Sequence, residues 1–133
     1  MDSRLHTYIQ DLNAPEASTR LRGADKIGEL VRSGELERKE TEEVNNHVHT
    51  IYSFSPYSPS MAAYKSWEAG LGAVGIMDHD SVGGGEEMLT SCASLGMGST
   101  VGFELRVNFS GTALEGRKLN SPDSLNIGYI AIH

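Results

Sequence analysis

The sequence predicts an α/β fold in which parallel strands alternate with helices. After residue 43, segments with the pattern of a buried strand alternate with segments whose apolar residues have helical spacing. Residues 44–133 also hold 12 of the 15 glycines, which mark turns between these segments. Because strands separated by helices favour parallel pairing, we expect one sheet built from βα units.

The first 43 residues predict an N-terminal helical extension followed by a charged connector. Apolar residues recur at helical spacing between residues 16 and 32, and Ser33 and Gly34 end this helix. Residues 35–43 are rich in Lys and Glu, which is the pattern of a solvated connector. We therefore divide the chain into this extension with its connector, residues 1–43, and a second domain, residues 44–133.

The second domain begins with a predicted strand and helix. Residues 44–49 form the strand, and a loop rich in Ser, Pro and Tyr follows it. Ser58 is a good N-cap, and Pro59 suits the first position of the helix. Gly70 is expected to end this helix.

Three further segments complete the predicted sheet. Residues 73–77 form a buried strand, and the helix after it ends at Gly96. Apolar and polar residues alternate from 100 to 109, as in a strand with one buried face. After a longer polar connection, residues 125–132 form the last strand, which we expect to run parallel to the others.

Length, charge and cysteine content exclude several classes of protein. A closed eight-stranded α/β barrel needs roughly 250 residues, and this chain has 133. The net charge of −7 argues against duplex nucleic acid as a partner. Bound cations would make the charge of a site locally positive, so a small phosphorylated substrate is compatible with this composition. No apolar run approaches the roughly 20 residues of a membrane span, and no secretory signal is seen. The single cysteine, Cys92, fits a cytoplasmic protein.

Ionisable side chains lie where the predicted strands end. His47 and His49 end the first strand, and their spacing puts both imidazoles on one side of it. Asp78 and His79 end the second strand, and Glu104 lies in the third. Sites in α/β sheets lie at the carboxyl ends of the strands, so we expect these groups to converge. The candidate metal ligands are His47, His49, His79 and Glu104, and His133 ends the fourth strand.

Each of these features alone has an ordinary structural explanation. A His-x-His pair is more often a surface pair than a metal site, and Glu104 could be a buried acid paired with Arg106. Together, three imidazoles and a carboxylate from separate strands are the ligands used for Zn, Mn or Fe. A carboxylate can also bridge two ions. Asp78 is expected to orient a neighbouring ligand, and Arg106 is a candidate for binding substrate phosphate.

Three ordered segments resemble the successive motifs of the PHP (polymerase and histidinol phosphatase) superfamily. They are Val-Asn-Asn-His-Val-His-Thr at residues 44–50, Gly-Ile-Met-Asp-His-Asp-Ser at residues 75–81, and Gly-Phe-Glu at residues 102–104. Residues 52–59 are similar to a signature of bacterial PHP-domain proteins. The resemblance implies a distorted, TIM-like (β/α)7 barrel. Such a barrel would bind two or three divalent ions and would hydrolyse phosphoesters. It makes His47, His49, His79 and Glu104 metal ligands, with Glu104 as the bridge.

The chain also departs from the family pattern. Phe54 follows Ser53 where many members have Asp, and the late Asp-x-His motif is absent. Members of the family also carry a further histidine on the strand after the Glu motif. Asn126 or His133 could occupy that position, and we favour His133 as a metal ligand because it ends its strand. We therefore expect the chain to be the N-terminal part of a longer protein. An open sheet edge at the last strand would then favour self-association.

These observations favour a metal-dependent phosphoesterase that is incomplete in this chain. Two alternatives stay open. One is a non-catalytic PHP fold kept as a metal-stabilised scaffold or interaction module, which Phe54 and the missing late motif favour. The other is a related metal hydrolase that acts on C–N bonds.

Overall fold

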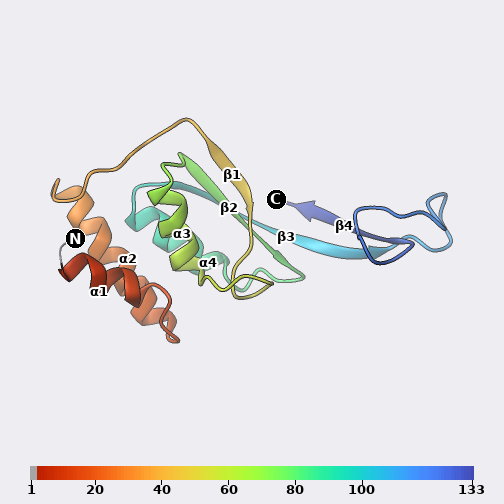
Figure 1. Cartoon of the computed structure of the whole chain (residues 1–133), viewed down its shortest axis with the longest axis horizontal. Coiled ribbons are helices and arrows are strands. Elements are labelled where there is room, and N and C mark those ends of the chain that lie inside the picture. The colour runs from red at the N-terminus through yellow and green to blue at the C-terminus, as the bar shows by residue number, and fades with distance from the viewer. Residues whose placement is uncertain (1–2) are drawn as a thin grey trace.

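The computed structural model describes residues 3–133 as an α/β chain with a curled sheet of mostly parallel strands (Figure 1). The helices are α1 (Ser3–Asp11), α2 (Ala17–Arg32), α3 (Pro59–Glu68) and α4 (Gly85–Ser94). The strands are β1 (Val44–Val48), β2 (Ala73–His79), β3 (Gly98–Asn108) and β4 (Ile127–Ile132). They form one sheet in the order β1-β2-β3-β4.

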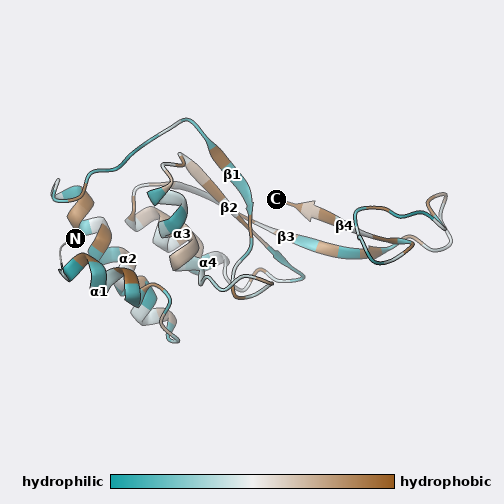
Figure 2. Ribbon diagram, viewed as in Figure 1, coloured by the Kyte–Doolittle hydropathy of each residue, from teal (hydrophilic) through white to brown (hydrophobic). Residues whose placement is uncertain are grey.

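The local signals in the sequence correspond to the observed element ends. Ser58 caps α3 by accepting a hydrogen bond from the Met61 N–H, and Pro59 is the first residue of that helix. Gly70 and Gly96, which follow α3 and α4, have φ of 88° and 71°, a conformation that favours glycine. The connector between α2 and β1 is mostly hydrophilic, as predicted (Figure 2). Across residues 3–133, none of the helices has the length and apolar character that crossing a membrane requires.

The predicted direction of the last strand is wrong. β1, β2 and β3 are parallel, but β4 is antiparallel to β3, with Asn108 paired to Ile127 and Phe103 to Ile132. A parallel return requires a crossover, usually a helix, whereas residues 109–126 form turns. As a result β3 and β4 form a long hairpin that projects from the body of the molecule (Figure 1).

Two asparagines hold the turn region of this hairpin. Asn126 has φ of 66°, and its side chain accepts a hydrogen bond from the Gly116 N–H at 2.5 Å. The Asn120 amide donates to the Tyr129 carbonyl at 2.8 Å and accepts from the Tyr129 N–H at 2.6 Å. Asn120 therefore imitates a neighbouring strand and satisfies part of the outer edge of β4.

β1 contains a bulge between Asn45 and Val48, at His47. The register with β2 shifts by one residue between Asn45 and Val48. The Asn45 side chain accepts a hydrogen bond from the His47 N–H at 3.0 Å. The bulge brings the Asn46 backbone so close to Gly75 that a Cβ at residue 75 would lie 2.8 Å from the Asn46 Cα. Bulges redirect side chains, and this one contains His47 and precedes His49.

The helices pack on one face of the sheet and leave its other face without a helical layer (Figure 1). On β2 the side chains of Val74 and Ile76 point into the core below the helices. The alternate residues of the strands point to the open face, among them His79 on β2 and its neighbour Glu104 on β3. The open face therefore carries the candidate site.

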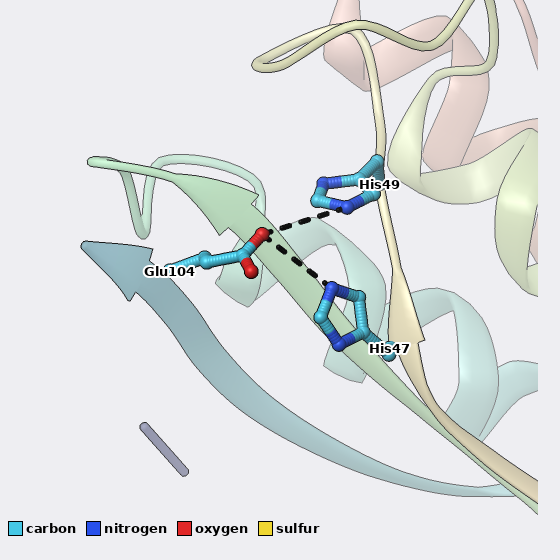
Figure 3. A group of neighbouring side chains, drawn as sticks. All are labelled: His47, His49 and Glu104. Atoms are coloured by element: carbon cyan, nitrogen blue, oxygen red, sulfur yellow. Dashed lines mark ion pairs between the residues drawn. The ribbon is translucent and has the colours of Figure 1, made fainter. Parts of the chain in front are cut away.

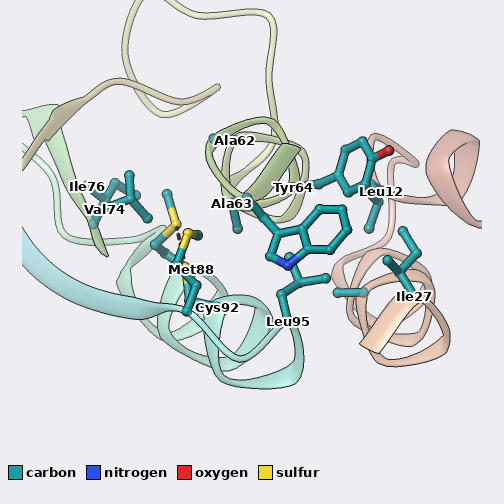
Figure 4. Close-up of a cluster of buried hydrophobic side chains, with 13 residues drawn as sticks. Leu12, Ile27, Ala62, Ala63, Tyr64, Val74, Ile76, Met88, Cys92 and Leu95 are labelled. Carbon is teal, nitrogen blue, oxygen red and sulfur yellow. Dashed lines mark hydrogen bonds between the residues drawn. The ribbon is translucent and has the colours of Figure 1, made fainter. Parts of the chain in front are cut away.

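The N-terminal extension shares the core of the α/β part. Leu12 and Ile27 pack with Tyr64, Met88 and Leu95 in one cluster (Figure 4). The division of the chain into two domains stays a prediction, but the two parts bury their apolar side chains together.

A buried ion pair strengthens this connection. Arg20 of α2 donates to both carboxylate oxygens of Glu87 on α4, at 2.8 and 2.6 Å. Arg20 also donates to the carbonyls of Ala14 and Pro15, and Glu87 accepts from the Ser60 N–H and hydroxyl. Burial alone would raise the pKa of the Glu87 carboxyl, but hydrogen bonds from Arg20 and Ser60 lower it. α2, α3 and α4 are thus joined by one fully hydrogen-bonded polar network.

Candidate metal centre

Two strands bring three imidazoles to a carboxylate of a third strand on the open face of the sheet. His47 and His49 come from the end of β1, His79 ends β2, and Glu104 lies on β3 beside His79. Figure 3 shows the imidazoles of His47 and His49 directed at the Glu104 carboxylate. These are four of the five residues that the sequence predicts as metal ligands.

The three imidazoles surround a single oxygen atom of the Glu104 carboxylate. Glu104 Oε2 lies 3.5 Å from His47 Nε2, 3.9 Å from His49 Nε2 and 3.4 Å from His79 Nε2. These distances are longer than the roughly 2.7–3.2 Å of a normal N–H···O hydrogen bond. Each histidine thus directs the same nitrogen at the same oxygen without forming a good hydrogen bond to it.

Three of these residues, His47, His49 and Glu104, have donor atoms within 4.8 Å of one another, so they could hold a divalent ion. Ligands about 2.0–2.2 Å from one tetrahedral ion lie about 3.3–3.6 Å from one another. The separations of His47 and His79 from Glu104 fall in this range, and that of His49 is slightly longer. Histidine nitrogen and carboxylate oxygen are also the donors that Zn²⁺ and related ions prefer. His47, His49 and Glu104 therefore fit a divalent ion, and His79 lies beside this group through its approach to Glu104.

The surroundings of His49 favour a neutral imidazole. Its ring stacks on that of His79 with centroids 4.9 Å apart and an interplanar angle of 8°, and His47 meets its edge at 5.1 Å. Burial lowers the pKa of His49, and the nearby His79 and His47 lower it further. Since only a neutral imidazole has a free lone pair, this shift favours metal binding near neutral pH.

Asp78 is buried behind the centre and contacts the loop after β1. It is 1% exposed, and it accepts hydrogen bonds from the Thr50 N–H and hydroxyl, both at 2.7 Å, and from the Ser53 hydroxyl at 2.8 Å. Its link to a candidate ligand therefore runs through Ser53, whose Oγ lies 3.2 Å from His49 Nδ1. From the sequence Ser53 is only the neighbour of Phe54, because one serine in a serine-rich loop carries no signal of its own.

His133 does not contact the Glu104 carboxylate, unlike the other predicted ligands. Because β4 is antiparallel, its end lies beside Gly102, and His133 Nδ1 is 3.5 Å from Thr100 Oγ1. The expectation that a parallel strand carries His133 to the carboxyl edge of the sheet is wrong for this reason.

Arg106 lies two residues beyond Glu104 on the same face of β3. Its guanidinium lies 5.5 Å from the centre of the Tyr129 ring, and Tyr129 in turn meets the edge of His79 at 5.2 Å. Arg106 and Tyr129 line a cavity of about 320 Å³ together with Ser121, Asp123, Ser124 and Ile127. A cation and a polar cavity thus adjoin the cluster of imidazoles.

Phe54 forms part of the rim of the centre. Its side chain is 86% exposed, its ring meets the edge of His79 at 5.2 Å, and its φ is 54°. A positive φ is costly for a residue with a bulky side chain. Phe54 is therefore both exposed and strained.

No protein-family model matches the sequence, and no curated protein matches it. Among solved structures, the chain is similar to a protein from Bifidobacterium adolescentis whose name proposes a metal-dependent phosphoesterase. The two are 23% identical, with a TM-score of 0.47 over 51% of this chain. This chain spans about a quarter of the length of that protein, 24%.

Proposed function

We propose that this chain provides a divalent-metal centre for the hydrolysis of phosphoesters. The observation that carries the proposal is the convergence of three imidazole Nε2 atoms on Glu104 Oε2, at 3.4–3.9 Å. The ligands would be His47, His49, His79 and Glu104. When bound, such an ion activates water for attack near neutral pH and stabilises negative charge on phosphoryl oxygens. The proposal includes Glu104 as the bridge to a second or third ion, and Zn, Mn or Fe as the bound metal.

The side chains around the centre have distinct roles in this proposal. Arg106 would bind the phosphate of a small substrate, because its guanidinium lies on the same face as Glu104 and matches phosphate geometry. Asp78 would hold the loop that carries His49 in place through Thr50 and Ser53. The choice of a phosphoester over a C–N bond depends on Arg106 and on the resemblance of the motifs.

Metal content is the first test. Protein purified without chelator should contain a transition metal, measured by elemental analysis, and a His47→Ala/His49→Ala double variant should lose it. His6→Ala is the matched control, because His6 lies on α1 and pairs with Gln10. Equal metal content in the double variant and the wild type would refute the assignment. Binding should weaken below about pH 6, where imidazoles become protonated.

Turnover separates the enzyme from the scaffold. Hydrolysis of p-nitrophenyl phosphate with added Mn²⁺ or Zn²⁺, lost in Glu104→Gln and weakened in Arg106→Ala, would support the phosphoesterase. The exposed Phe54 at the rim favours the second candidate, a metal-stabilised module without catalysis. Metal that depends on His47 and His49, with turnover neither in this chain nor in a longer chain that completes the barrel, would support that candidate.

A further inference from the structure

The Ser53 hydroxyl is the meeting point of three polar groups behind the candidate centre. Its Oγ lies 2.8 Å from Asp78 Oδ1, 3.0 Å from the His79 backbone nitrogen and 3.2 Å from His49 Nδ1. Ser53 is itself buried in the loop between β1 and α3. A group with three partners in a buried place must distribute a fixed number of protons among them.

One distribution of the protons satisfies all three contacts. A serine hydroxyl has one proton to donate and two lone pairs that accept. The Asp78 carboxylate only accepts, so the Ser53 proton is donated to Asp78 Oδ1. The His79 N–H only donates, so it occupies one lone pair of Ser53. The remaining lone pair faces His49 Nδ1, and this contact is a hydrogen bond only if Nδ1 carries the proton.

We infer that Ser53 is a positioning residue that holds His49 in its Nδ1–H tautomer. In this tautomer Nε2 carries a lone pair and no proton, and Nε2 is the atom directed at Glu104 Oε2, 3.9 Å away. The inference rests on the proposed function for its purpose, because a lone pair at Nε2 is what a metal ion requires. Histidine ligands commonly donate their second ring N–H in this way, which fixes tautomer and ring orientation.

The same network connects the orientation of His49 to strand β2. Asp78 precedes His79 on β2, and Ser53 accepts the N–H of His79 itself. A displacement of Ser53 would therefore release the ring of His49 and the backbone of His79 together. This joint control explains why a buried carboxylate and a buried hydroxyl lie behind the centre without contacting Glu104.

Nitrogen NMR of the metal-free protein tests the inference directly. In protein labelled with ¹⁵N-histidine at about pH 8, long-range ¹H–¹⁵N correlations distinguish a protonated ring nitrogen from an unprotonated one. Wild-type His49 should show a proton on Nδ1 and none on Nε2. Observation of the Nε2–H tautomer in the wild type would overturn the inference without any variant.

Two substitutions at Ser53 and one matched control sharpen the test. Ser53→Ala should give His49 a mixture of tautomers and weaken Zn²⁺ affinity by about 10–100-fold. Ser53→Thr keeps the hydroxyl and should keep both the tautomer and the affinity. Ser55→Ala is the control in the same loop, because the Ser55 hydroxyl accepts only from the Tyr57 N–H. An unchanged His49 tautomer in folded Ser53→Ala would overturn the inference.

The tautomer and the proposed function fail separately. If Zn²⁺ does not bind the wild type but the tautomer changes in Ser53→Ala, the role of Ser53 is supported and the metal centre is refuted. If Zn²⁺ binds through His47 and His49 but the tautomer does not depend on Ser53, the centre is supported and the positioning role is refuted.

Discussion

At the scale of single residues, the candidate centre depends on imidazoles that stay neutral. Burial and the neighbouring His79 and His47 lower the pKa of His49 below its ordinary value of 6.5. In the unfolded chain this imidazole takes up a proton more readily than in the folded chain. The contribution of His49 to stability is therefore complete above about pH 6.5, and it decreases as the pH falls toward the lowered pKa.

This sign leads to a prediction for the metal-free protein. The free energy of unfolding should fall as the pH falls below about 6.5, and the fall should be smaller in His49→Gln, which has no proton to gain. Urea unfolding followed by the fluorescence of Trp67, the single tryptophan, measures it. His6→Gln on α1 is the control and should keep the wild-type pH dependence. An identical fall in His49→Gln and wild type would contradict the prediction.

Phe54 is a second residue whose effect on the free energy of unfolding can be measured. Its φ of 54° is unfavourable for a side chain with a Cβ, and the exposed ring has little packing to lose. Phe54→Gly should therefore raise the free energy of unfolding by up to about 1 kcal/mol. Phe54→Ala, which keeps the Cβ, should not. Equal stability of the two variants would show that the backbone at residue 54 is not strained.

At the scale of elements, the bulge of β1 and the glycine beneath it form one unit. A Cβ at Gly75 would lie 2.8 Å from both the Asn46 Cα and Thr100 Oγ1. Gly75→Ala should push β1 away from β2, destabilise the fold by about 1–3 kcal/mol and lower metal affinity. Gly72→Ala, where the nearest atom is 3.2 Å from the added Cβ, is the milder control. Calorimetric titration with Zn²⁺ and urea unfolding measure the two effects, and wild-type Zn²⁺ affinity in Gly75→Ala would separate the bulge from the site.

The helices depend on the buried pair of Arg20 and Glu87. Arg20→Ala should cost about 3–5 kcal/mol, because it leaves a buried carboxylate without its cation. Arg32→Ala, which removes an exposed ion pair with Asp25, should cost less than about 1 kcal/mol. Adding Glu87→Gln to Arg20→Ala should recover part of the loss, since a neutral amide is less costly to bury. Equal costs for Arg20→Ala and Arg32→Ala would refute the importance of the buried pair.

Elements with strong local signals could be predicted from the sequence, and their arrangement in space could be predicted only in part. The cap at Ser58 and the glycines after the helices determine element ends through local backbone chemistry, and these predictions are confirmed. The bulge after Asn45 depends on contacts with β2, and the sequence of a short strand does not predict it. Arg20 and Glu87 are 67 residues apart, and charged residues on helices resemble solvated ones until their partner is known.

The candidate site shows the same division. The histidines and Glu104 could be predicted because strand ends of a parallel sheet share one edge, and β1, β2 and β3 are parallel. The expectation for His133 failed because it assumed a crossover where residues 109–126 form turns. Ser53 could not be recognised, because its role depends on three partners from different parts of the chain.

At the scale of the whole molecule, self-association stays a prediction, and we expect it on one face of the hairpin. Part of the outer edge of β4 is satisfied by Asn120. The face that pairs Phe103 with Ile132 and Leu105 with Ile130 is apolar, and both isoleucines are exposed. An apolar hollow of about 340 Å³ on this face is lined by Val82, Phe103 and Leu105, beside Asp80 and Ser81. Exposed apolar surface of this kind favours association.

Light scattering after size-exclusion chromatography should therefore detect a dimer or a larger species. Ile130→Lys, which places a charge on an exposed apolar residue of β4, should shift the protein toward 14.4 kDa. Asn120→Ala should increase association, because it frees backbone groups at the edge of β4. A monomer at all concentrations for the wild type would contradict the prediction.

The position of β1 has a consequence for how the centre would open and close. β1 is a short edge strand, exposed over most of its length and paired only with β2 through an interrupted register. Such strands undergo local opening at a lower free energy than the core of a sheet. When β1 detaches, two imidazoles leave together while His79 and Glu104 stay in place on the inner strands. The apparent affinity for an ion is then the intrinsic affinity reduced by the fraction of time that β1 is detached. By the same linkage a bound ion would slow amide exchange in residues 44–49 more than in β2 or β3, and its escape rate would be limited by the opening of this one strand.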